Sequence, residues 1–228
     1  MTATGLAGLP TPCLLLDRAR MQANIDRMAD RARELGVRLR PHVKTCKSAE
    51  IARLMTGSGQ PAITVSTLRE AEYFAAAGFD DILYAVSIVP RRIERVLDLH
   101  ARGVNVQVLL DSPATAREVA AIAAAAGRTI DTWIEIDVDG HRAGLEPDDP
   151  AVVDLGRVVQ DAPGLDFAGV LTHAGGAYDC ESEIGLERHA EQERRRCVRA
   201  AQNLREAGVA CPDISVGSTP TALSARDL

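Results

Sequence analysis

Residues 81–127, "DILYAVSIVPRRIERVLDLHARGVNVQVLLDSPATAREVAAIAAAAG", contain the pattern that decides the fold. Short apolar runs alternate there with longer helix-like runs, at 81–86, 90–102, 104–110 and 113–126. Gly103 and Gly127 stand where each of the two helices is expected to end. Strands that alternate with helices are typical of a parallel sheet whose faces are covered by helices.

The same alternation extends over the rest of the chain. Further strand-like runs lie at 13–17, 37–44, 62–66, 132–138, 167–173 and 213–217. Further helix-like runs lie at 18–35, 47–56, 67–77, 149–161 and 182–208. Eight strands and seven helices in 228 residues favour an α/β fold of the (β/α) TIM-type barrel class. Two Rossmann halves are disfavoured, because neither GxGxxG after a strand nor GxxxxGK[ST] is present.

Composition excludes several classes of partner. The net charge is −6 and only 3% of residues are aromatic, so no nucleic acid is expected to bind. No apolar run approaches the ~18 residues of a membrane span, and the N-terminus does not resemble a signal peptide. The five scattered cysteines form no CxxC pair, which predicts reduced thiols and a cytoplasmic protein.

The stretch "RLRPHVKTCKS" at 38–48 contains the only two lysines, Lys44 and Lys47, so the other 24 of the 26 basic residues are arginine. Arginine cannot replace lysine where an amine must lose its proton and act as a nucleophile. Two solvated lysines left by chance are the alternative. Arg40, His42 and Lys44 share one face of a strand, which predicts that Lys44 faces the barrel mouth. Lys47 is expected to face solvent or a phosphate.

Polar residues follow several other strand-like runs, at the ends where barrels place their active sites. They are Arg69, Glu135, Asp137, Asp139, His141, Arg142, His173 and Tyr178. The turn "VGSTPT" at 216–221 offers backbone N–H groups to an anion. Alone, each signal could be structural, and the charged run 187–196 is expected to be a solvated helix face. Together they suit an aldehyde cofactor that carries a phosphate.

Five motifs then resemble one family. They are "TPCLLLD" at 11–17, "RPHVKTCKS" at 40–48, "DVDGHRAG" at 137–144, "THAGGAY" at 172–178 and "SVGSTPT" at 215–221. In this order they resemble the fold-type III pyridoxal phosphate (PLP) enzymes, and most closely the D-serine dehydratase and D-threonine aldolase-like family. The barrel of that family is of the alanine racemase N-terminal type, and the match spans essentially the whole chain.

The resemblance implies roles for individual residues. Lys44 would hold PLP covalently, and Lys44, Arg142 and His173 would be catalytic. The implied cofactor-binding residues are His42, Lys44, Arg142, His173, Tyr178, Gly217, Ser218 and Thr219. No metal ligand is expected in this chain. Cys46 and Gly176 stand where relatives carry histidine, which puts the choice of substrate in doubt.

The resemblance also implies that residues 1–228 form one PLP-binding barrel domain without the last strand and the C-terminal β domain. The run 13–17 would belong to that second domain. Zinc or manganese is expected only in a full-length relative, which would be a homodimer. The implied function is a PLP-dependent lyase acting on a small D-amino acid, of D-serine dehydratase or D-threonine aldolase type. The alternatives are an amino-acid racemase, a non-catalytic PLP-binding protein or an inactive fragment.

Overall fold

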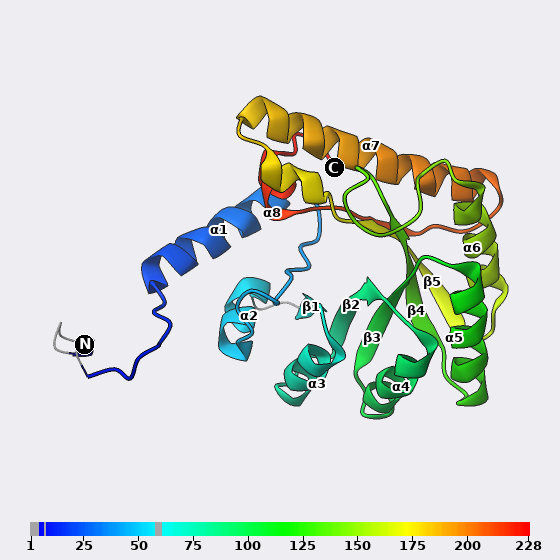
Figure 1. Ribbon diagram of the computed structural model, residues 1–228, viewed down its shortest axis with the longest axis horizontal. Helices are drawn as coiled ribbons and strands as arrows, with labels where there is room; N and C mark the ends of the chain where they lie inside the picture. The colour runs from blue at the N-terminus through cyan, green and yellow to red at the C-terminus, as the bar shows by residue number, and fades with distance from the viewer. Residues whose placement is uncertain (1–4, 7, 58–60) are drawn as a thin grey trace.

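The computed structural model describes residues 5–6, 8–57 and 61–228. Six parallel strands form one curved sheet in which neighbours in sequence are neighbours in space (Figure 1). They are β1 Ala62–Val65, β2 Asp81–Ser87, β3 Asn105–Leu110, β4 Ile130–Ile136, β5 Leu165–Thr172 and β6 Asp213–Ser215. This order and direction are those of a (β/α) barrel, so the predicted fold class is confirmed.

Helices connect successive strands and pack on the outer face of the sheet (Figure 1): they are α3 Leu68–Ala76, α4 Ile93–Ala101, α5 Pro113–Ala125, α6 Pro150–Asp161 and α7 Glu183–Glu206. Two helices, α1 Arg18–Glu34 and α2 Ala49–Thr56, precede β1, and α8 Thr219–Ser224 follows β6; α1 contacts α2 and α8 and lies away from the sheet (Figure 1). The short 3-10 helices are η2 Pro90–Arg92 and η3 Gly175–Asp179. No helix among the described residues is long and apolar enough to cross a membrane.

Local sequence sets the helix ends. The hydroxyl of Thr67 accepts a hydrogen bond from the backbone N–H of Glu70 at 3.0 Å, which caps the start of α3. Ser182 caps α7 in the same way, with Gly185 as the donor at 3.1 Å. Gly103 and Gly127 follow α4 and α5 with φ of 82° and 63°, the left-handed conformation that suits glycine. The predicted helix ends are therefore confirmed at these positions.

Side chains on the two faces of the sheet form two separate apolar clusters. The larger cluster lies under the helices and includes Ile82, Val106, Ile134 and Val170. The smaller cluster lies on the opposite, inner face and contains Leu83, Leu109, Trp133 and Leu171. Because successive residues of a strand point to opposite faces, both clusters come from the same four strands.

A polar network fills the inner face below the smaller cluster. Arg40 contacts Asp81 with a 2.8 Å ion pair between Nη1 and Oδ1. Gln107 donates from Nε2 to the same Asp81 oxygen at 2.8 Å and accepts from Trp133 Nε1 at 2.7 Å. The network connects residues 37–44 with β2, β3 and β4. Side chains therefore fill the inner face of the sheet at this level.

Two predicted strands do not form. Residues 13–17 pair with no strand, and Leu14 is fully exposed at 102%. Residues 37–44 make one parallel bridge, in which Val43 donates to Thr64 and Thr64 donates to Pro41, both at 2.9 Å. Pro41 has no N–H to extend the ladder, and a turn begins at Val43. The prediction of eight strands is therefore wrong for the described residues.

The predicted turn at 216–221 leads into a helix that was not predicted, α8. Ser218 and Thr221 form a capping box, in which the Ser218 N–H donates to Thr221 Oγ1 at 2.8 Å. Pro220 occupies the first helical turn, where its missing N–H costs nothing. The signal was present in the sequence as a Ser-x-Pro-Thr start, but the run is only six residues long.

Candidate active site

Lys44 lies in the turn that follows the His42 bridge, at the carboxyl end of β1. The side chains of Arg40 and His42 are half-buried and alternate with buried Pro41 and Val43, as the strand pattern predicted. Lys44 itself is exposed, and among the described residues no carboxylate lies within ion-pair distance of its amine. Its position leaves the amine accessible to a small molecule.

Lys47 has a different environment. Its Nζ lies 3.3 Å from Oε1 of Glu70, whose side chain is 11% exposed. The other Glu70 oxygen accepts the backbone N–H of Ser66 at 2.8 Å, which fixes the carboxylate. Lys47 thus faces solvent, as predicted, with a side chain that is 66% exposed, and its amine also pairs with a carboxylate. Lys44 has no such ion pair among the described residues, so the two lysines differ in environment.

His42 is held as a neutral imidazole beside Lys44. Its Nδ1 accepts the backbone N–H of Lys44 at 3.3 Å, so Nε2 carries the hydrogen and donates to Ser66 Oγ at 3.2 Å. Burial, and then the charge of Lys44, lower the pKa of His42 from 6.5 to about 4. Sequence analysis did not single out Ser66, although it is the last residue of the predicted strand 62–66.

His173 directly follows β5 and lies in the same region. Its Nδ1 is 3.4 Å from the carbonyl oxygen of Gly217. Burial is the largest cause that lowers the pKa of His173, and the charges of Arg142 and Lys44 act in the same direction. The ring of Tyr178 lies 6.1 Å from the His173 ring, and Tyr178 is 59% exposed. The structure therefore brings six predicted residues together in the segments next to β1, β4, β5 and β6: His42, Lys44, Arg142, His173, Tyr178 and Gly217.

Arg142 lies in the loop after β4 and packs against Gly175. A Cβ on Gly175 would lie 2.8 Å from the Cγ and Cδ atoms of Arg142, so glycine is needed for this approach. Burial raises the pKa of Glu135, while the hydrogen bond from Ser87 at 2.9 Å and the charge of Arg142 oppose the rise. Glu135 is thus a half-buried carboxyl of the inner face.

The predicted strand 132–138 would place Glu135 and Asp137 on one face and Asp139 just beyond it. In the structure β4 ends at Ile136, so Asp137 and Asp139 lie in the following loop. Asp137 accepts the backbone N–H of Gly140 at 2.9 Å and shapes the following turn. Asp139 accepts the N–H of Gly176 at 2.8 Å and so holds η3. Among the described residues, no group of three or more His, Cys, Asp or Glu side chains is arranged to hold a metal ion.

In the predicted anion-binding turn, Thr219 is the residue whose side-chain hydroxyl no described residue engages. Both polar groups of Ser218 are engaged with Thr221, and Ser218 is 4% exposed. The Gly217 N–H interacts with the Glu193 carboxylate. Thr219 is exposed and makes no side-chain hydrogen bond with the described residues. An anion at this turn would therefore meet Thr219 first.

Glu193 was missed by sequence analysis, because the run 187–196 was interpreted as a solvated helix face. Glu191 and Arg195 of this run are exposed, but Glu193 is only 2% exposed. Its Oε1 accepts the backbone N–H of Ala174 at 2.9 Å. The available signal was its spacing, three residues after Ala190 and four before Cys197, both of which are buried on α7.

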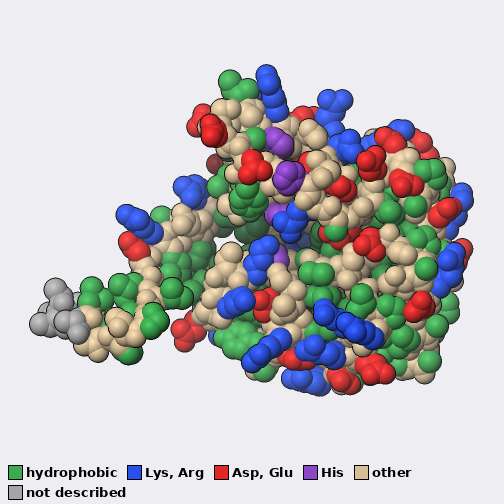
Figure 2. Space-filling model, in the orientation of Figure 1, with side chains coloured by type: hydrophobic (Ala, Val, Ile, Leu, Met, Phe, Trp, Pro, Cys, Tyr) green, Lys and Arg blue, Asp and Glu red, His purple; other side chains and the backbone are tan. Residues whose placement is uncertain are grey.

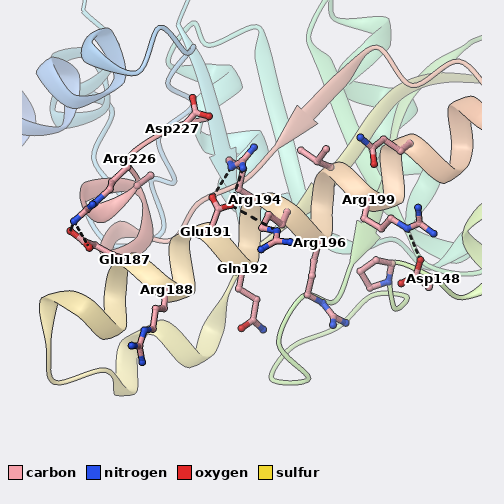
Figure 3. Close-up of a pocket in the computed structure, with 15 residues that line it drawn as sticks. Asp148, Glu187, Arg188, Glu191, Gln192, Arg194, Arg196, Arg199, Arg226 and Asp227 are labelled. Carbon is pink, nitrogen blue, oxygen red and sulfur yellow. Dashed lines mark hydrogen bonds and ion pairs between the residues drawn. The ribbon is translucent and has the colours of Figure 1, made fainter.

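The surface has two distinct hollows. Histidine side chains gather along a hollow in the middle of the face shown in Figure 2. A separate groove of about 1050 Å³ runs along the outer side of α7 and contains none of the predicted site residues (Figure 3). Its charges are mostly paired, as in Arg199–Asp148 at 2.8 Å. The predicted residues therefore lie outside the α7 groove.

Comparisons with known proteins agree with this arrangement. Residues 16–228 match the model of the family described as alanine racemase, N-terminal domain. The chain is 50% identical over 224 residues to D-threo-3-hydroxyaspartate dehydratase of Delftia sp. (strain HT23), covering 98% of this chain and 59% of the relative. It is 34% identical over 217 residues to D-threonine aldolase of Arthrobacter sp., covering 95% of this chain and 57% of that relative.

A solved structure of the dehydratase from Delftia sp. HT23 superposes with a TM-score of 0.93 at 49% identity, covering 97% of this chain and 58% of the other. The chain thus spans somewhat more than half the length of the relatives that it matches.

Proposed function

Because the chain belongs to the alanine racemase N-terminal domain family, we propose that it is the cofactor-binding barrel of a PLP-dependent lyase. The observation that carries the proposal is Lys44, an accessible amine beside two histidines with lowered pKa values. The names of the relatives, a hydroxyaspartate dehydratase and a threonine aldolase, supply the substrate class. That class is the D-β-hydroxy amino acids.

The residues at the site fit PLP. The accessible amine of Lys44 suits the aldehyde, since Lys47 is engaged with Glu70. The rings of His173 and Tyr178 suit a planar pyridine ring between or beside them. Thr219 suits the phosphate, because it is exposed and no described residue engages its hydroxyl. Gly217, whose polar groups face His173 and Glu193, would shape the turn rather than donate to the phosphate. Ser218 is the poorest fit of the predicted set, as Thr221 engages both of its polar groups.

When bound, PLP withdraws electrons from the substrate Cα and so makes a bond there easier to break. Lys44 would hold the cofactor aldehyde, and its free amine would act as the base that takes a proton from the substrate Cα. Neutral His42 and His173 add no positive charge beside the cofactor ring. Arg142 offers a planar, bidentate donor for the substrate carboxylate or a cofactor oxygen. Loss of the β-hydroxyl is dehydration, and cleavage of Cα–Cβ is the aldolase reaction.

Of these two reactions we propose dehydration, because this chain is 50% identical to the hydroxyaspartate dehydratase and 34% identical to the threonine aldolase. The five cysteines are all free thiols, which supports a cytoplasmic location. A homodimer, and zinc or manganese bound by a longer relative, are further parts of the proposal that follow from the family resemblance.

Borohydride reduction in the presence of PLP, followed by peptide mapping, tests the proposal. We expect the pyridoxyl group on Lys44. The Lys44→Ala variant should lose the label, and the matched Lys47→Ala variant, which removes a lysine three residues away, should keep it. A label on Lys47 in the wild-type chain, or equal labelling of both variants, would contradict the assignment.

A further inference from the structure

Glu193 is a buried carboxyl with no cationic partner. It is 2% exposed on α7, and among the described residues no Lys, Arg or His lies within ion-pair distance of it. Burial raises its pKa, as expected when a charge leaves water. An acidic side chain in such a place is costly unless hydrogen bonds satisfy it. The groups that donate hydrogen bonds to Glu193 therefore indicate the role of this side chain.

The partners of Glu193 come from two neighbouring strand ends. Oε1 accepts the backbone N–H of Ala174 at 2.9 Å, directly after His173 and β5. Hydrogen bonding from the side chain of Thr221 and the backbone of Gly217, which follow β6, opposes the rise in the pKa of the same carboxylate. Since β5 and β6 are adjacent in the sheet, one side chain on α7 joins the two loops that carry the predicted site.

Gly217 is the residue that most needs such a partner. Its φ of 131° is a conformation that other residues rarely adopt, and glycine has the greatest backbone freedom. The Gly217 carbonyl faces Nδ1 of His173 at 3.4 Å, while its N–H interacts with Glu193. With both polar groups engaged, the peptide is held in one orientation, and the exposed Thr219 is presented two residues later.

We infer that Glu193 is a positioning residue that holds the Gly217–Thr219 turn in the shape that accepts a phosphate monoester. The inference rests on the proposed function, since the phosphate is that of PLP. Glu193 does not touch the phosphate, because two anions in contact would repel each other. It acts through the Gly217 N–H. Its hydrogen bond from the Ala174 N–H also fixes the position of the adjacent His173 relative to the turn.

The test compares Glu193→Gln with Glu191→Gln, an exposed neighbour on the same helix that pairs with Arg194 (Figure 3). Absorbance titrations give the Kd for PLP and for pyridoxal, which carries the same aldehyde without the phosphate. Glutamine keeps the size of the side chain but has one acceptor oxygen where glutamate has two. We expect Glu193→Gln to weaken PLP binding by about tenfold, the value of one hydrogen bond, and to leave pyridoxal binding within about twofold. Glu191→Gln should change neither.

The ratio of the two affinities separates the possible outcomes. If Glu193→Gln weakens the binding of PLP and pyridoxal equally, Glu193 is a general structural residue. If PLP binding is unchanged, Glu193 has no positioning role. Either result overturns the inference about Glu193 and leaves the proposed function standing. A wild-type chain that binds pyridoxal as tightly as PLP would overturn the proposed function as well. If Glu193→Gln does not fold, Glu193→Asp carries the same expectation, because it keeps both acceptor oxygens but is one methylene too short to reach the turn.

Discussion

At the scale of single residues, the lowered pKa of His42 predicts how stability depends on pH. The fold favours neutral His42, with a pKa of about 4, whereas the unfolded chain protonates near the ordinary value of 6.5. The stabilisation is therefore complete above pH 6.5, falls as the pH decreases toward 4, and is constant below that. His173 has a pKa shifted in the same direction, so the two slopes add.

Urea unfolding at pH 7 and pH 5 measures this slope. We expect the wild-type chain to lose about 1 kcal/mol more free energy of unfolding than His42→Asn over this interval, allowing for the partial exposure of the ring. The variant removes one titrating group and keeps a polar side chain of similar reach. Parallel pH dependence of the two chains would show that His42 is protonated equally in the folded and unfolded states.

Single residues also differ in how far the sequence predicted their environment. The alternation of a strand predicted one shared face for Arg40, His42 and Lys44, and the burial pattern shows that alternation from Arg40 to Val43, while Lys44 is exposed in the following turn. The engagement of Ser218 by Thr221 did not follow, because any of the polar groups in "GSTPT" could have capped the helix. Glu193 was missed because a charged side chain among arginines normally signals solvent, and its three donors come from distant segments.

At the scale of elements, the pairing of β5 with β6 depends on Gly169. Its φ is 145°, and a Cβ there would overlap the carbonyl oxygen of Asp213 in β6. Gly127, after α5, has a φ of 63°, but a Cβ at that position would meet no heavy atom within 4 Å. The two glycines thus share the backbone requirement, and only Gly169 adds a steric one.

We therefore expect Gly169→Ala to cost about 3 kcal/mol of unfolding free energy, from backbone strain and the displaced strand. Gly127→Ala should cost about 1 kcal/mol, the usual cost of alanine at a left-handed helix end. Urea denaturation of both variants checks the difference. Equal losses would mean that β6 moves away from β5 without cost, and that this edge of the sheet is held loosely.

The elements themselves were largely predictable from local sequence. The six observed strands and the helices between them follow apolar runs bounded by caps and glycines, such as Gly103 and Gly127. The run 13–17 has the same composition as a strand, yet it forms none. A strand needs a neighbouring strand to pair with as well as a suitable sequence pattern, and the sequence of the run does not specify that neighbour.

At the scale of the whole molecule, Leu14, Leu15 and Leu16 form an apolar surface at the start of α1. They are 102%, 65% and 62% exposed, on an arm that projects from the body (Figure 1). Adjacent exposed leucines favour association, because burying apolar surface is worth about 25 cal/mol per Å². The net charge of −6 opposes association, and salt would screen that repulsion.

We expect the chain to self-associate with increasing concentration, and more strongly as salt is added. Replacing Leu14, Leu15 and Leu16 together with serine should lower the weight-average mass in sedimentation experiments at the same concentration. The free energy of unfolding should change by less than about 0.5 kcal/mol, since exposed side chains contribute little to the core. Leu54→Ser is the matched control, because Leu54 is a 47% exposed leucine outside this surface. If the triple variant associates as strongly as the wild type, the contact lies elsewhere, and the edge at β6, which pairs with no further strand among the described residues, becomes the surface to test.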